Sequence, residues 1–285
     1  MDKNKTSNTQ SGVLHSETLN ADRTYSVFLP NNYDADSMRR YPILYMLHGL
    51  SGTDQGWFEN YHFKDIYDSL VDAGEIEEMI VVMANAGGDI LKDWNGYFDV
   101  KGWQYETFYF TEFMPFIEKN YRVIADKQHC AIVGISMGGG GATSYAQRHS
   151  ELFGSVYAMS ALMDLSDKKY MPDNMSAMLG DANQHLNNEK KDISKIVKMY
   201  DSVKKHSCIK YIEFADNNQK EQLRSINWFI DCGKDDFLFD RNNEFVQAME
   251  KSQIPCLFYF GDGGHVHEYW ESSLPNCLKF VSKNY

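Results

Sequence analysis

One serine of the chain stands in a setting that suits a nucleophile. Ser136 is the centre of GISMG, residues 134–138, directly after an apolar stretch and directly before the helix-like segment GGGGATSYAQRH. A GxSxG between a buried strand and a helix places the serine on a tight turn, where small neighbours let the backbone bend and leave the hydroxyl exposed. We therefore predict that Ser136 is a catalytic nucleophile.

A nucleophilic serine needs a base within hydrogen-bond reach and a carboxylate that orients this base. In enzymes with a strand–GxSxG–helix turn, the order along the chain is serine, acid, histidine, and the acid and the base follow later strands. Asp235 and Asp236 follow one apolar stretch, and His265 and His267 follow the next. The sequence therefore meets both the order and the strand-end position.

Each pair leaves a choice. We favour Asp236 as the acid because residues 237–239 (FLF) would anchor and bury its loop, although Asp235 lies closer to the strand end. We favour His265 as the base because two preceding glycines let its ring return over the sheet, and His267 would then point elsewhere. His-x-His also occurs at metal sites, but no third cluster of ligands accompanies it, so we expect neither a metal nor another cofactor.

A tetrahedral intermediate needs two N–H donors for its oxyanion. One donor is expected to be the N–H of Met137, the residue after the nucleophile. The second is expected in the turn HGLSG, residues 48–52, which follows an earlier apolar stretch, and Leu50 N–H is the candidate. His48 is predicted to be a structural hydrogen-bonding residue, since a base from an earlier strand would violate the chain order.

Apolar stretches that end near glycine, serine or aspartate alternate with helical patterns along the chain. Near-continuous apolar runs are typical of strands covered on both faces by helices, and their alternation with helices favours a mostly parallel, doubly wound sheet. Together with the strand–GxSxG–helix turn and the order serine, acid, histidine, this sheet predicts an α/β-hydrolase fold. The predicted strands are 24–30, 41–49, 79–86, 129–136, 154–160, 226–233 and 256–264, and the predicted helices include 105–121, 240–252 and 268–282.

The chain is expected to form a single domain over residues 12–285, after a flexible tail of residues 1–11. Residues 161–225 interrupt the rhythm, because 65 residues separate two strands that one helix could connect. We interpret this segment as an insertion of helices and loop over the carboxyl edge of the sheet. The alternative is that this segment is a surface loop without a role in function.

Composition limits the classes of partner. Of the 285 residues, 28 are Lys or Arg and 40 are Asp or Glu, which gives a formal net charge of -12. This balance argues against a nucleic acid or an anionic membrane surface as the main partner. No apolar run approaches the length of a bilayer span, and the first 20 residues are too polar for a signal peptide. The compartment stays open between cytoplasm and, if a leader has been removed, periplasm or exterior, and the oligomeric state is not specified.

Five segments together resemble one family. They are LHGLSGTDQGWF, YETFYFTEFMPFIEKNYRV, GISMGGGGA, DCGKDDFLF and GGHVHEYW, which occur in this order from about residue 12 to the end of the chain, with 161–225 excepted. They look like the esterase family of α/β-hydrolases that includes feruloyl and acetyl-xylan esterases, S-formylglutathione hydrolases and mycolyltransferases. The resemblance implies Ser136 as nucleophile, Asp236 as acid, His265 as base, and Leu50 and Met137 as oxyanion donors.

The resemblance also implies a small-molecule or oligosaccharide ester as substrate. Aromatic residues near the expected mouth suit a phenolic acyl group or a sugar face, and we select Trp57, Trp103 and Trp270 as substrate-binding residues. The favoured function is a serine esterase that releases feruloyl or acetyl groups from plant cell-wall carbohydrate. The alternatives are an acyltransferase of the mycolyltransferase type and a general short-chain or S-formylglutathione-type esterase.

Overall fold

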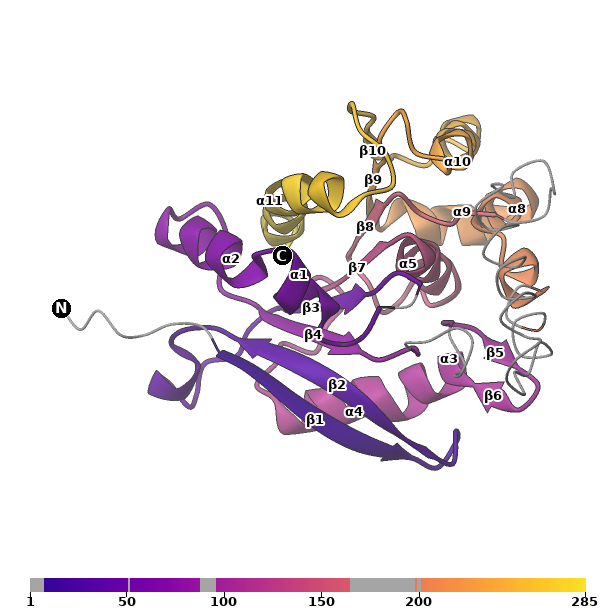
Figure 1. Ribbon diagram of the computed structural model, residues 1–285. Helices are drawn as coiled ribbons and strands as arrows, with labels where there is room; N and C mark the ends of the chain where they lie inside the picture. Colours follow the sequence, from indigo (N-terminus) through magenta and orange to yellow (C-terminus); the bar gives the residue numbers. More distant parts are fainter. Residues whose placement is uncertain (1–7, 51, 88–95, 165–197, 199–200) are drawn as a thin grey trace, which may run out of the picture.

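A mostly parallel sheet forms the centre of the molecule (Figure 1). The computed structural model describes residues 8–50, 52–87, 96–164, 198 and 201–285. The main sheet contains β1 (Asn8–Ser16), β2 (Ala21–Leu29), β3 (Ile43–Leu47), β4 (Ile80–Ala84), β7 (Cys130–Ile135), β8 (Ser155–Met159), β9 (Asn227–Asp231) and β10 (Leu257–Tyr259), and β5 (Asp99–Val100) pairs separately with β6 (Trp103–Gln104).

The strand order is β1-β2-β4-β3-β7-β8-β9-β10 within the described residues. Neighbours from β4 to β10 pair in parallel, and β2 pairs antiparallel with both β1 and β4. The predicted doubly wound α/β sheet is therefore confirmed.

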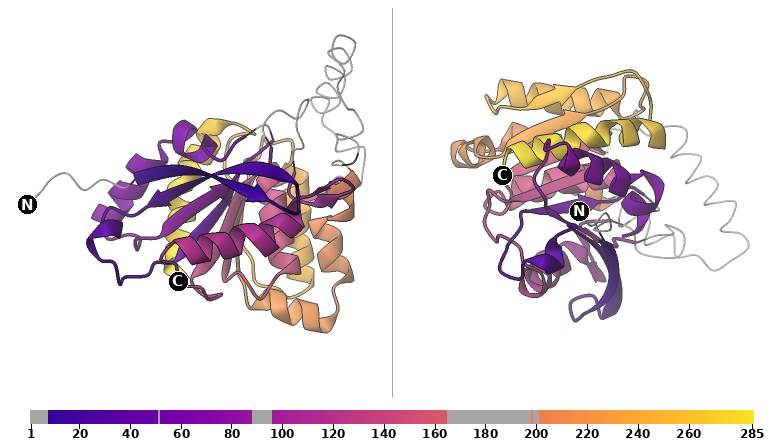
Figure 2. Two further views of the ribbon diagram at one scale, coloured as in Figure 1. Left: turned by 90° about the horizontal axis from the view of Figure 1, so that it is seen from below. Right: turned by 90° about the vertical axis from the view of Figure 1, so that its left-hand side faces the viewer.

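Helices cover both faces of the sheet (Figure 2). Successive side chains of β3 alternate between two hydrophobic cores, because strand side chains point to opposite faces: Ile43 and Tyr45 join one core, and Leu44 and Met46 join the other. None of the helices in the described ranges has both the length and the apolar character that a bilayer span requires. The helices of the first core are α3 (Tyr105–Phe108), α4 (Met114–Asn120), α5 (Met137–Arg148), α8 (Cys208–Phe214), α9 (Asn217–Arg224) and α10 (Phe239–Lys251); those of the second are α1 (Gly56–Asn60), α2 (Phe63–Asp72) and α11 (His267–Lys283).

The prediction that residues 1–11 form a flexible tail is wrong for residues 8–11. Strand β1 begins at Asn8, and residues 8–11 pair with residues 26–29 of β2. These four residues are polar and exposed, so the apolar pattern that predicts a buried strand is missing, and backbone hydrogen bonds to β2 form the strand instead. Residues 1–7 lie outside the described part.

The predicted insertion at 161–225 lies largely outside the described part, because residues 165–197 and 199–200 are not described. Its described end forms α8 and α9, which lead into β9, and α8 packs against α5 and α10. The position of the insertion over the carboxyl edge therefore stays a prediction.

The strand order changes direction at one point of the sheet. From β3 the chain moves to β4 on one side, and β7 then returns to the other side of β3. In open α/β sheets the loops that leave the carboxyl ends of such strands diverge, and ligands bind between them. The turn that begins at His48 follows β3 and Ser136 follows β7, so the strand order brings the predicted oxyanion turn and the predicted nucleophile together.

Candidate active site

Ser136 lies on a strained turn between β7 and α5. Its backbone has φ 53° and ψ -118°, a conformation that non-glycine residues rarely adopt. The flanking glycines are required by close approach: a Cβ on Gly134 would lie 2.1 Å from the carbonyl oxygen of Gly138, and one on Gly138 would lie 2.3 Å from that of Leu47. The backbone is therefore closely packed on both sides of Ser136, and this packing fixes the position of the serine.

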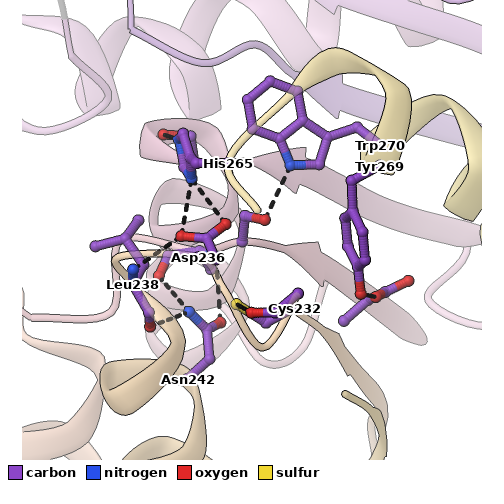
Figure 3. A network of polar contacts seen from close by, with 12 residues as sticks. Cys232, Asp236, Leu238, Asn242, His265, Tyr269 and Trp270 are labelled. Atoms are coloured by element: carbon purple, nitrogen blue, oxygen red, sulfur yellow. Dashed lines mark hydrogen bonds and ion pairs between the residues drawn. The ribbon is translucent and has the colours of Figure 1, made fainter. Parts of the chain in front are cut away.

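The structure brings Ser136, His265 and Asp236 into one hydrogen-bonded chain. His265 Nε2 is 2.9 Å from Ser136 Oγ. On the other side of the ring, Nδ1 lies 2.9 Å from Oδ2 and 3.1 Å from Oδ1 of Asp236 (Figure 3). The Asp236 side chain is completely buried, whereas that of His265 keeps 18% of its surface exposed. The geometry therefore suits proton transfer at Nε2, with the carboxylate fixing the opposite nitrogen.

The surroundings of Asp236 keep it ionised. Burial alone would raise the pKa of this carboxyl, but the hydrogen bond and charge of His265, the Ser160 hydroxyl and the Leu238 N–H outweigh burial and lower the pKa below its usual value. The Leu238 N–H donates to Oδ1 at 2.8 Å. Ser160 is itself held by Trp270, whose indole N–H donates to the Ser160 hydroxyl at 2.9 Å (Figure 3).

The other member of each predicted pair lies elsewhere. Asp235 is exposed, and its N–H donates to the carbonyl oxygen of Gly263 at 2.9 Å. This hydrogen bond connects the loop that carries Asp236 to the loop that carries His265. His267 is the first residue of α11 and stacks on Tyr61, with ring centroids 5.1 Å apart. Both histidine rings contact Trp270, but of the two only His265 is hydrogen-bonded to Ser136 and Asp236.

The predicted oxyanion donors lie on the two turns that meet at Ser136. Met137 is the first residue of α5, and a Cβ on Gly49, next to Leu50, would lie 3.5 Å from the Ser136 Cβ. Within the described residues, neither the Leu50 N–H nor the Met137 N–H donates a hydrogen bond. Their assignment as oxyanion donors stays a prediction.

His48 holds the oxyanion turn in place. Its Nδ1 lies 2.8 Å from the Gly49 carbonyl oxygen, and its Nε2 accepts the Ala86 N–H at 2.9 Å, so the ring is neutral with the proton on Nδ1. Burial lowers the pKa of His48 to about 4. The prediction of a structural role for this histidine is confirmed.

The three tryptophans selected as substrate-binding residues are all buried. Trp57 of α1 is 1% exposed and packs in the second core with residues of α2, and Trp103 lies in the first core with Arg23 above its ring. Trp270 meets His265 edge to face, with ring centroids 4.8 Å apart. The assignment of the three tryptophans as substrate-binding residues stays a prediction, because aromatic content in a sequence does not show which way a ring points.

Two residues of the site were missed by sequence reasoning. Ser160 ends β8 much as Ser136 ends β7, and this position at a strand end is the signal that could have found it. Phe237 belongs to the apolar run that is predicted to bury the loop of Asp236, but its side chain is 40% exposed. It lies against the His265 ring, with ring centroids 4.4 Å apart. Leu238, which is 2% exposed, provides the anchor instead.

Comparison with known proteins places this geometry in a family. The family model described as "Putative esterase" matches residues 16–281. The chain belongs to this esterase family. A solved ferulic acid esterase is 49% identical, with a TM-score of 0.88, and the match covers 99% of this chain and 100% of that one. This family membership supports a carboxylic-ester hydrolase of the serine type.

Two curated relatives are longer proteins. The endo-1,4-beta-xylanase/feruloyl esterase of Xylanibacter ruminicola is 32% identical over 170 residues, which are 58% of this chain and 22% of that protein. Esterase Rv1288 of Mycobacterium tuberculosis is 36% identical over 137 residues, which are 47% of this chain and 28% of that protein. The matches thus span about a quarter of the length of these relatives.

Proposed function

We propose that this chain hydrolyses feruloyl or acetyl esters of plant cell-wall carbohydrate, with Ser136 as nucleophile, His265 as general base and acid, and Asp236 as the group that orients His265. The continuous hydrogen-bonded chain from Ser136 Oγ through the His265 ring to Asp236 carries this proposal. The N–H groups of Leu50 and Met137 support it, because neither has a hydrogen-bond partner among the described residues and acyl transfer needs donors for a developing oxyanion.

The first half of the reaction transfers the acyl group to the enzyme. Ser136 Oγ attacks the ester carbonyl carbon while His265 Nε2 takes its proton, and the N–H groups of Leu50 and Met137 stabilise the oxyanion. The protonated Nε2 then gives this proton to the alcohol oxygen as the ester C–O bond breaks. Asp236 stays ionised, which agrees with its lowered pKa, and stabilises the imidazolium through Nδ1.

The second half releases the acid. Water takes the place of the alcohol, His265 Nε2 removes its proton, and the resulting attack on the acyl-enzyme forms a second tetrahedral intermediate in the same oxyanion site. Its collapse returns the proton to Ser136 Oγ and frees the carboxylic acid. An acyltransferase would use the same acyl-enzyme with another alcohol in place of water.

The substrate class rests on the relatives rather than on the buried tryptophans. The ferulic acid esterase that is 49% identical over nearly the full chain supports a feruloyl group, and the Xylanibacter protein combines the names xylanase and feruloyl esterase. A plant cell-wall ester fits both names.

The test combines a variant, a covalent probe and a substrate panel. Ser136→Ala should fold normally and lose at least about a thousandfold in kcat, as removal of a triad member does. A fluorophosphonate should label Ser136 and leave the buried Ser160 unlabelled. Methyl ferulate, p-nitrophenyl acetate and acetylated xylan, each with and without a polyol acceptor, then identify the acyl group. Retention of a tenth of the activity by Ser136→Ala would overturn the mechanism, and an acylated polyol as main product would identify a transferase.

A further inference from the structure

One large apolar side chain is exposed directly beside the proposed base. Phe237 follows Asp236 in sequence, keeps 40% of its surface exposed, and lies with its ring centroid 4.4 Å from that of His265 at an interplanar angle of 43°. Within the part of the chain that the structure describes, two aromatic rings contact His265: Trp270 is buried, whereas Phe237 is exposed. Phe237 therefore offers a ligand an aromatic surface next to the base.

The backbone on both sides of Phe237 is anchored, so its ring is presented from a fixed position. The preceding Asp236 carboxylate accepts the Leu238 N–H, and the Asp236 carbonyl accepts the Phe239 N–H at 2.9 Å. Leu238 is buried, and its carbonyl oxygen accepts a hydrogen bond from Asn242 of α10 at 2.9 Å (Figure 3). An exposed ring on an anchored loop loses little conformational entropy when a ligand covers it.

The reaction determines which part of an ester lies near His265. The carbonyl oxygen must point to the N–H groups of Leu50 and Met137, whereas the oxygen of the leaving alcohol must lie within hydrogen-bond reach of His265 Nε2, because it receives the proton there. An exposed side chain that lies against the His265 ring is therefore placed to contact the alcohol portion rather than the carbonyl oxygen.

We propose that Phe237 is a specificity-determining residue that binds the sugar of the leaving alcohol. This inference rests on the proposed function and extends it from the acyl group to the alcohol. A sugar ring has an apolar face of C–H groups, and such a face packs well on an exposed aromatic ring. A methyl ester has no group large enough to cover the Phe237 ring, so the residue should distinguish the two alcohols.

The kinetic consequence is confined to one half-reaction. A feruloylated arabinose-xylose oligosaccharide and methyl ferulate give the same feruloyl-enzyme, and the alcohol has left before water attacks. Phe237→Ala should therefore lower kcat/KM for the oligosaccharide ester about tenfold, which corresponds to about 1.4 kcal/mol, and change that for methyl ferulate less than twofold. Single-turnover acylation should carry the whole loss, and the rate of deacylation should stay the same.

Two further variants make the result specific. Phe237→Leu retains an apolar side chain without the flat ring, and it should show an intermediate loss. Phe214→Ala removes a phenylalanine that is 81% exposed at the end of α8, and it should alter neither substrate. Near-ultraviolet and far-ultraviolet circular dichroism check that each variant is folded.

Several outcomes would overturn the proposal. Equal losses on both esters, or a shifted pH profile, would mean that Phe237 acts by positioning His265. An unchanged kcat/KM for the oligosaccharide ester would mean that the sugar lies elsewhere. A wild-type enzyme that hydrolyses methyl ferulate without favouring the oligosaccharide ester refutes the sugar subsite alone, whereas a wild-type enzyme that hydrolyses neither ester refutes the proposed function.

Discussion

Replacing Asp236 with asparagine is expected to inactivate the enzyme without disturbing its fold, and Leu238 is the reason. The Leu238 N–H donates to Oδ1 of residue 236 at 2.8 Å, so the single oxygen of an asparagine would be held at this position. The NH₂ group would then stand where Oδ2 lies, 2.9 Å from His265 Nδ1. Because an NH₂ group can only donate to Nδ1, the ring proton would have to sit on Nε2.

This tautomer reverses the hydrogen bond that starts the reaction. Nε2 faces Ser136 Oγ at 2.9 Å, and with its own proton it would donate to the hydroxyl instead of accepting from it. The corresponding exchange in a serine protease triad lowers kcat about ten-thousandfold, which is about 5 kcal/mol of transition-state stabilisation. We expect a loss of this order for Asp236→Asn with both methyl ferulate and p-nitrophenyl acetate.

Asp235→Asn is the matched control, because it makes the same chemical change one residue away on an exposed side chain. Its kcat should stay within about twofold of the wild type, and both variants should unfold in urea close to the wild-type midpoint. A loss of less than tenfold for Asp236→Asn, or a larger loss for Asp235→Asn, would refute the assignment of the acid and the argument from Leu238.

Three further changes test other parts of the site. His265→Ala should lose at least about a thousandfold in kcat and His267→Ala less than about threefold; the reverse ranking would show that the final loop is assigned two residues out of register. Ser160→Ala leaves the buried Trp270 indole N–H without its acceptor and should lower the free energy of unfolding by about 1–3 kcal/mol. Urea titration measures this free energy, and an unchanged value would contradict a stabilising Trp270–Ser160 hydrogen bond. Burial holds the pKa of His48 at about 4, against 6.5 in the unfolded chain. The folded state then binds fewer protons than the unfolded state between these values, so the free energy of unfolding should fall by up to about 3 kcal/mol as the pH is lowered from 6.5 to 4. His48→Gln should flatten this dependence relative to the wild type, and equal pH profiles for the two proteins would contradict it.

The chemistry at the strand ends could be predicted because local sequence specifies it. The tight turn at Ser136 requires glycines at two fixed positions, and the close approaches of Gly134 and Gly138 show why no larger residue fits there. The choice of Asp236 over Asp235 was also made on a local signal, the apolar run after it. The structure shows that the anchor of this run is Leu238, with Phe237 exposed.

Other features depend on contacts between distant segments. Strand β1 has no apolar alternation at residues 8–11, because hydrophobic periodicity reports burial and these residues form a strand by backbone pairing alone. Likewise, nothing near Trp270 in the sequence indicates that its indole N–H binds Ser160, which lies 110 residues away. A sequence shows that a tryptophan exists, but its direction is set by packing around the whole sheet.

The position of the acid and the base is set mainly by the sheet and less by their own loops. Backbone hydrogen bonds continue beyond the carboxyl ends of β7, β8, β9 and β10, so that each loop of the site begins as an extension of the strand ladder. They run from Ser136 N–H to Met159 O (2.9 Å), from Ser160 N–H to Asp231 O (2.7 Å), from Cys232 N–H to Tyr259 O (3.1 Å) and from Asp235 N–H to Gly263 O (2.9 Å). Because His265 follows β10, the bond between Nε2 and Ser136 Oγ depends on the register of all four strands. The three-residue edge strand β10 is exposed along its length, yet it is the element that carries the base to the nucleophile.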